Sequence, residues 1–116
     1  MRQITYSNQR AFDLVWDHFI TRKQPRSISK DGRCSYRSRR GAKRCAIGVL
    51  IPDDRYDRSF DSDKVRLTAV LKQAKIKIDV DFASQLQITH DRSANREDLR
   101  ESLLHLAERC DLKLPK

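Results

Sequence analysis

Three cysteines and a histidine are the residues of this chain that best suit metal binding. Cys34, Cys45 and His90 offer two thiolates and an imidazole to a tetrahedral zinc ion, with Cys110 or His105 as a fourth ligand. Structural zinc sites usually contain closely spaced pairs such as Cys-x-x-Cys, whereas Cys34 and Cys45 are eleven residues apart. Only a β-hairpin would bring these two thiols together, so the sequence favours buried thiols over a metal site.

The same side chains permit covalent catalysis as an alternative. In a small hydrolase-like enzyme, His90 would act as a base that activates Cys34 or Cys45, and Asp91 would orient the imidazole. His90 and Asp91 end an expected helix, however, where an imidazole can complement the helix dipole. A structural or hydrogen-bonding role for His90 is therefore the favoured interpretation.

The sequence contains no motif for binding nucleotide phosphates or calcium. The three glycines are too far apart to form a Gly-rich phosphate-binding loop. The acidic stretch from Asp53 to Asp63 lacks the glycine and the terminal Glu of an EF-hand loop. We expect these acids to cap a helix and to balance nearby positive charge, and the sequence predicts no cofactor.

The net charge is confined to one part of the chain, residues 22–44, which we call the basic segment. The 116 residues include 25 basic and 16 acidic side chains, a net charge of +9. The basic segment has ten of the basic residues and one acid, so it carries the whole excess. A patch of this kind attracts a polyanion and steers its approach.

A β-hairpin is expected within the basic segment, because two short runs flank a Gly-containing loop. With the loop centred between residues 39 and 40, Tyr36 faces Lys43 and Cys34 faces Cys45. We therefore expect the two thiols to be reduced, with Cα atoms within about 7 Å of each other.

This Arg-rich hairpin suits contact with nucleic acid, because arginine can grip phosphate while an aromatic ring stacks on a base. The alternatives are a solvated face and a patch that docks on an acidic protein. The concentration of net charge favours contact with a polyanion or an acidic surface. No helix-turn-helix, zinc-finger or ribonucleoprotein motif accompanies the hairpin, so base-specific recognition is not predicted. The expected binding residues are Arg33, Tyr36, Arg37, Arg39, Arg40, Lys43 and Arg44.

Helical periodicity dominates the rest of the chain. Apolar stripes and capping residues predict helices over about 8–23, 61–75, 79–91 and from 95 onward. Residues 46–51 are apolar on every side and fit either a strand or a helix. The sequence predicts an α+β fold of about four helices packed with a small β-hairpin, a single domain over residues 1–116 with the hairpin region at about 27–51.

The sequence has no feature of a secreted or membrane protein. Its longest apolar run, residues 45–51, is too short to span a bilayer. The first residues turn polar where a signal peptide needs an apolar stretch, and an odd number of cysteines argues against a disulfide framework. We expect a cytoplasmic protein without a membrane partner.

Three segments resemble a group of small uncharacterised proteins from bacteriophages and bacteria. They are Cys34-Ser35-Tyr36-Arg37, Lys43-Arg44-Cys45-Ala46-Ile47-Gly48-Val49-Leu50-Ile51-Pro52-Asp53 followed by Tyr56, and Leu86-Gln87-Ile88-Thr89-His90-Asp91. The resemblance implies an accessory protein of a phage or mobile element and carries no established activity. The Arg-rich hairpin departs from the pattern of that group, which suggests a particular partner.

The leading hypothesis is therefore a non-enzymatic inhibitor or modulator that binds nucleic acid, or the acidic surface of a host nucleoprotein machine, through the hairpin. The alternatives are the Cys/His enzyme and a scaffold domain that binds only another protein. A pocket with a thiol within hydrogen-bond reach of His90 would favour the enzyme, whereas a filled core around these groups would favour binding.

Overall fold

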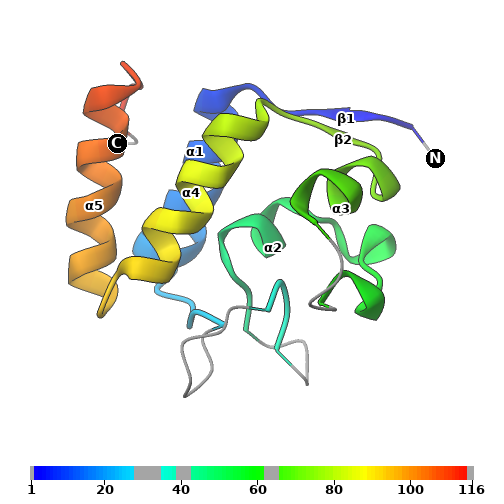
Figure 1. The fold of residues 1–116 in the computed structure, drawn as a ribbon. Coiled ribbons are helices and arrows are strands. Elements are labelled where there is room, and N and C mark those ends of the chain that lie inside the picture. Colours follow the sequence, from blue (N-terminus) through cyan, green and yellow to red (C-terminus); the bar gives the residue numbers. More distant parts are fainter. Residues whose placement is uncertain (1, 28–34, 39–42, 62–65, 115–116) are drawn as a thin grey trace.

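The fold is described from a computed structural model, which covers residues 2–27, 35–38, 43–61 and 66–114. As predicted, it is an α+β fold, in which the described residues form five α-helices and a short parallel sheet. The helices are α1 (Asn8–Trp16), α2 (Ala46–Leu50), α3 (Leu67–Gln73), α4 (Val80–Arg92) and α5 (Arg96–Arg109). Figure 1 shows α1, α4 and α5 side by side, with α2 and α3 on the other side of α4.

Side-chain caps fix where the three longest helices begin, and all three starts were predicted. The hydroxyl of Ser7 accepts a hydrogen bond from the Arg10 amide at the start of α1, at 3.0 Å. The carboxylate of Asp79 and the amide oxygen of Asn95 do the same for α4 and α5. Such caps satisfy backbone N–H groups that have no partner within the helix. Beyond α1 the chain continues in a π-helical turn, η1 (Asp17–Thr21).

The core forms where α1, α4 and α5 face one another. The buried side chains of α5 recur at helical spacing, and they pack against aromatic residues from α1 and η1. Full burial of each such side chain contributes about 1.5–3 kcal/mol to folding. None of the helices in the described ranges is long and apolar enough to cross a membrane.

The helix expected over 61–75 is shorter than predicted, because α3 begins at Leu67. Residues 58–61 instead form a 3-10 turn, η3 (Arg58–Asp61), which follows another, η2 (Asp53–Arg55). The carboxylate of Asp61 accepts hydrogen bonds from the Tyr36 amide and from the Tyr56 hydroxyl, so Asp61 supports the hairpin rather than a helix start.

A parallel pairing of two very short strands was not predicted. Strand β1 (Ile4–Thr5) lies beside β2 (Ile76–Lys77), with Ile4 opposite Ile76. The Ile4 amide donates to the Lys75 carbonyl at 2.9 Å. Lys75, at φ 53°, turns the chain from α3 into β2. Two-residue strands leave no alternating pattern in a sequence, and their pairing joins positions far apart along the chain.

Candidate polyanion-binding site

The backbone of the basic segment is organised around Arg44. An isolated antiparallel bridge joins Arg44 to Arg37, and a parallel bridge joins it to Arg26. The Ser38 amide donates to the Lys43 carbonyl at 2.9 Å. These contacts confirm that the chain on the two sides of residues 39–42 pairs as a hairpin, and they add a third stretch that the sequence did not predict.

The hairpin register differs from the predicted one by two residues. Because Arg37 pairs with Arg44, Tyr36 lies across from Cys45 rather than from Lys43. The Cys45 amide donates to the Tyr36 carbonyl at 3.3 Å. The predicted pairing of Tyr36 with Lys43 is therefore wrong. Cys34 lies outside the described residues, so its predicted place beside Cys45 stays a prediction.

Gly48 accounts for this register. It lies in α2, whose N-terminus is capped by the thiol of Cys45, which accepts from the Gly48 amide at 3.4 Å. A Cβ atom on Gly48 would lie 1.9 Å from the Tyr36 carbonyl oxygen and 2.8 Å from its carbonyl carbon. Since real Cβ atoms need more than 3 Å, the hairpin backbone can lie on α2 only where the helix has a glycine.

Arg37 is buried, although it is among the binding residues expected from the sequence. Only 8% of its surface is exposed. Its guanidinium donates to the Ile51 carbonyl at 3.0 Å and pairs with the Asp53 carboxylate at 2.7 Å. It also lies over the Tyr56 ring, 4.6 Å from the centroid, a cation–π contact. Arg37 therefore anchors the hairpin and is not available to a phosphate.

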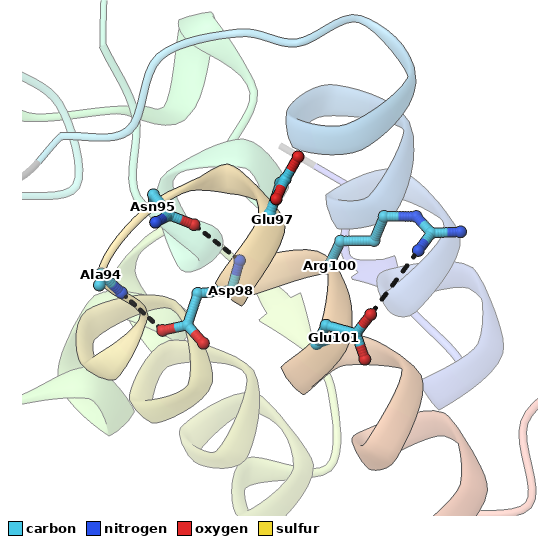
Figure 2. Close-up of a pocket in the computed structure, with 6 residues that line it drawn as sticks. All are labelled: Ala94, Asn95, Glu97, Asp98, Arg100 and Glu101. Carbon is cyan, nitrogen blue, oxygen red and sulfur yellow. Dashed lines mark hydrogen bonds and ion pairs between the residues drawn. The ribbon is translucent and has the colours of Figure 1, made fainter.

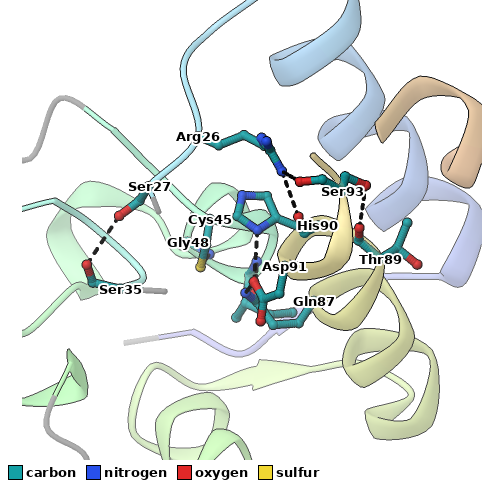
Figure 3. Close-up of polar contacts among 11 residues, drawn as sticks. Arg26, Ser27, Ser35, Cys45, Gly48, Gln87, Thr89, His90, Asp91 and Ser93 are labelled. Carbon is teal, nitrogen blue, oxygen red and sulfur yellow. Dashed lines mark hydrogen bonds and ion pairs between the residues drawn. The ribbon is translucent and has the colours of Figure 1, made fainter. Parts of the chain in front are cut away.

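Arg44 and Arg26 have similar anchoring roles. Arg44 pairs with the same Asp53 carboxylate at 2.9 Å. Arg26 donates to the carbonyl oxygens of His90 and Ser93 at 2.9 and 2.7 Å, and Figure 3 shows it reaching across to the end of α4. A cation at these last carbonyls of the helix complements its negative end. The expectation that nearby acids balance part of the basic charge is confirmed for Asp53.

Acid is expected to weaken this anchor. Hydrogen bonding from Arg37 and the charges of Arg37 and Arg44 hold the pKa of Asp53 below its ordinary value of 3.8. A carboxylate whose pKa is lowered by folding stabilises the fold fully above its unfolded pKa, and this contribution is lost as the pH falls through the folded value. In urea titrations from pH 6 to pH 2, wild type should therefore lose more unfolding free energy below about pH 4 than Asp53→Asn.

The control for this comparison is Asp54→Asn, which removes a neighbouring exposed carboxylate that forms no ion pair with any described residue. It should keep the wild-type pH dependence. Equal pH dependence in wild type and Asp53→Asn would contradict a role for the Asp53 carboxylate in the anchor.

The exposed cations gather along one edge, which we call the basic edge: Arg22, Lys23, Lys43 and Arg96. Since Arg26 pairs in parallel with Arg44, Pro25 lies beside Lys43, and Lys23 precedes Pro25 by two residues. Arg96 joins them because its guanidinium donates to the Lys23 carbonyl at 2.9 Å. Within the described ranges Lys23 and Lys43 form no ion pair, and the pair of Arg22 with Asp17 is exposed.

The pKa of His18 reports positive potential beside this edge. His18 lies in η1 with its ring edge-on to Phe19, 4.8 Å between centroids. Burial lowers its pKa first, and the charges of Arg44 and Arg22 lower it further, against an opposing effect of Asp17. Burial and the nearby charges of Arg44 and Arg22 therefore favour the neutral form of the imidazole.

The remaining predicted binding residues have different positions. Tyr36 is half-buried and packs against the core. Arg33, Arg39 and Arg40 lie outside the described residues. Arg96 was missed by the sequence, because its place beside Lys23 depends on the packing of two segments some 70 residues apart. As the first residue of α5, it gave no local sign of this contact.

His90 and Cys45 lie in the interior. The imidazole of His90 is fully buried, packs against Phe19 and lies with Nδ1 3.0 Å from the exposed Asp91 carboxylate. The Cys45 thiol is buried as the cap of α2. A general base must reach its substrate, so the burial of His90 opposes the catalytic interpretation. In the described part of the chain, no three His, Cys, Asp or Glu side chains are placed to hold a metal ion.

A large open pocket of about 810 Å³ lies at the start of α5, away from the predicted site residues (Figure 2). Its polar groups cap the helix: the Asp98 carboxylate accepts from the Ala94 amide, and the Asp98 amide donates to the Asn95 side chain, both at 2.8 Å. Arg100 and Glu101 approach within 4.0 Å at its rim. Because the Asp98 carboxylate serves the helix start and Glu101 lies beside Arg100, the pocket gives no separate sign of a ligand site.

No protein-family model, no curated protein and no solved structure matches this chain.

Proposed function

We propose that the protein is a small, non-enzymatic accessory protein that binds the phosphate backbone of a nucleic acid through the basic segment. By occupying that backbone it would modulate a nucleoprotein machine, as an inhibitor encoded by a phage or mobile element would. One observation carries the proposal. Arg26, Arg37 and Arg44 have partners inside the protein, whereas the other described cations of the same segment lie exposed at the basic edge.

This arrangement favours binding to phosphates because the anchoring arginines fix the backbone that carries the exposed cations. A charged surface that is already ordered loses less conformational entropy on binding than a flexible one. Pro25, two residues after Lys23, lies beside Lys43, and Arg39 and Arg40 precede Lys43 by only a few residues in the sequence. The half-buried ring of Tyr36 is poorly placed for stacking, so contacts to phosphates should dominate over contacts to bases.

The test is a triple variant of the basic edge, Arg22→Ala, Lys23→Ala and Lys43→Ala. Each cation that contacts a phosphate releases counterions, so the slope of log K against log salt should become shallower by up to about three units on duplex DNA. The fold should be almost unaffected, because these side chains are exposed and the Arg22 pair is worth at most about 1 kcal/mol. Salt-titrated binding to DNA and RNA duplexes measures the slope, and thermal unfolding checks the fold.

A matched control removes the same charge elsewhere: Arg10→Ala, Arg109→Ala and Lys113→Ala, three exposed positions outside the basic segment. Equal effects of the two triple variants would mean that net charge alone drives binding. Wild-type affinity of the basic-edge variant at every salt concentration would overturn the proposal. A lysate partner that is retained after nuclease treatment but lost by this variant would instead indicate an acidic protein surface.

A further inference from the structure

A second run of cations lies outside the basic segment, between residues 64 and 78. It contains five basic residues and no acidic one. The overall balance of charge outside the basic segment conceals this run, because the compensating acids lie elsewhere in the sequence. Three of the five lie close together where α3 ends and β2 begins; we call Lys72, Lys75 and Lys77 the lysine face.

The fold turns these three side chains outward. Ile76 and Ile78 are buried, whereas Lys77 between them and Lys75 in the preceding turn are exposed. Lys72 is exposed in the last turn of α3. Lys72 and Lys75 line a shallow pocket of about 270 Å³ with three further residues, Gln3, Leu71 and Ile76.

A structural explanation for the lysine face is incomplete. Cations at a helix C-terminus often stabilise the unpaired carbonyl groups there. At α3, however, Arg55 already donates to the carbonyl oxygens of Ala74 and Lys75, at 3.2 and 3.3 Å. Among the described residues, Lys72 and Lys77 form no ion pair. Like charges this close repel one another unless an anion lies among them.

The lysine face and the basic segment lie on different parts of the molecule. Figure 1 shows β2 at the top and the hairpin strands at the bottom. Because a separation seen in projection can only be larger in space, the two surfaces are distinct.

We propose that the lysine face binds a second phosphate backbone, so that one protein molecule bridges two nucleic-acid segments. The bridging rests on the proposed function, since the basic edge supplies the other contact. Three exposed cations, two of which line a shallow pocket, suit the regularly spaced charges of a phosphate backbone, which needs no deep or shaped site.

The experiment is a capture assay with one duplex DNA fixed to beads and a second, labelled duplex in solution. Wild-type protein should be retained on the beads and should capture the labelled duplex from solution. In the variant Lys72→Gln, Lys75→Gln, Lys77→Gln, capture should fall by at least about tenfold near 0.1 M salt, since each phosphate contact contributes roughly that factor. Retention of the protein on the beads should change little. A second variant has only Lys72→Gln and Lys77→Gln. It leaves Lys75 unchanged, because the backbone there has a positive φ and a substitution could affect the fold.

The outcomes separate this proposal from the proposed function. Wild-type protein that stays on the beads but captures no labelled duplex overturns bridging and leaves the proposed function standing. Full capture by both lysine variants also overturns it, because the bridge would then form through protein self-association. An equal loss of capture in the control triple variant at Arg10, Arg109 and Lys113 would show that net charge, not the lysine face, is responsible. Wild-type protein that is not retained at all refutes both proposals.

Discussion

Replacing Arg37 by Ala is expected to lower the free energy of unfolding by about 2–4 kcal/mol. The substitution leaves the buried Ile51 carbonyl without its donor, which costs about 1–3 kcal/mol. It also removes the cation–π contact with Tyr56, worth about 0.5–2 kcal/mol. The ion pair with Asp53 adds little to this figure, because the Asp53 side chain is 77% exposed.

Urea unfolding followed by circular dichroism measures this loss, and two variants serve as controls. Arg44→Ala removes a partner of the same Asp53 carboxylate from a more exposed position, so it should cost less than about 1 kcal/mol. Arg37→Lys keeps the charge but not the planar fork and should have an intermediate effect. A loss below that of Arg44→Ala would contradict the anchoring role of Arg37.

Gly48→Ala should destabilise the protein by at least about 2 kcal/mol. The added methyl group would overlap the Tyr36 carbonyl, a backbone atom that cannot rotate away, so α2 and the hairpin would have to separate. Overpacking of this kind typically costs about 1–3 kcal/mol and occasionally more. The expected loss is at the upper end of that range, because the overlap here is with the backbone.

The contact with the hairpin reverses the sign of the stability change that Gly48→Ala would otherwise cause. Alanine is intrinsically better than glycine inside a helix by about 1 kcal/mol, so without the contact the variant would be more stable than wild type. Denaturant unfolding of the two proteins decides between these outcomes. A stabilised Gly48→Ala would mean that the hairpin does not lie against α2 at Tyr36, and the register described above would be incorrect.

The helices were predictable because their signals are local. A cap followed by apolar residues at helical spacing identifies a start without any knowledge of the partner helix, as at Asp79 and Asn95. The apolar stretch after Cys45 was ambiguous because both of its possible structures would be buried. Its helical form depends on the Cys45 cap and on the close approach at Gly48.

The hairpin register was not predictable, because it depends on contacts outside the hairpin. A loop centred one residue later moves every cross-strand pair by two positions, and the local sequence allows either choice. What selects the observed register is the fit of the Tyr36 carbonyl over Gly48 and of the Tyr36 amide against Asp61. Neither contact can be predicted from the residues of the hairpin alone.

The candidate site was predicted in its location but not in the roles of its residues. Charge identified the basic segment, since charge is additive along a sequence. Charge could not show that Arg37 is buried and Lys43 exposed, because an arginine that pairs inside the protein and one that meets solvent look the same. The partners that distinguish them, Ile51 and Asp53, follow α2.

The pairing of β1 with β2 has a consequence for the order in which the chain assembles. Its two strands are separated by about 70 residues, so closing the loop between them early in folding would sacrifice a large amount of chain entropy for very few hydrogen bonds. We therefore expect the sheet to form late, after the helices have packed. The N-terminal strand is then a latch on a completed molecule, and it should open by local fluctuation without disturbing the helices. Because Ile4 and Tyr6 bond to the backbone of Lys75 and Lys77, that latch lies directly beside the lysine face.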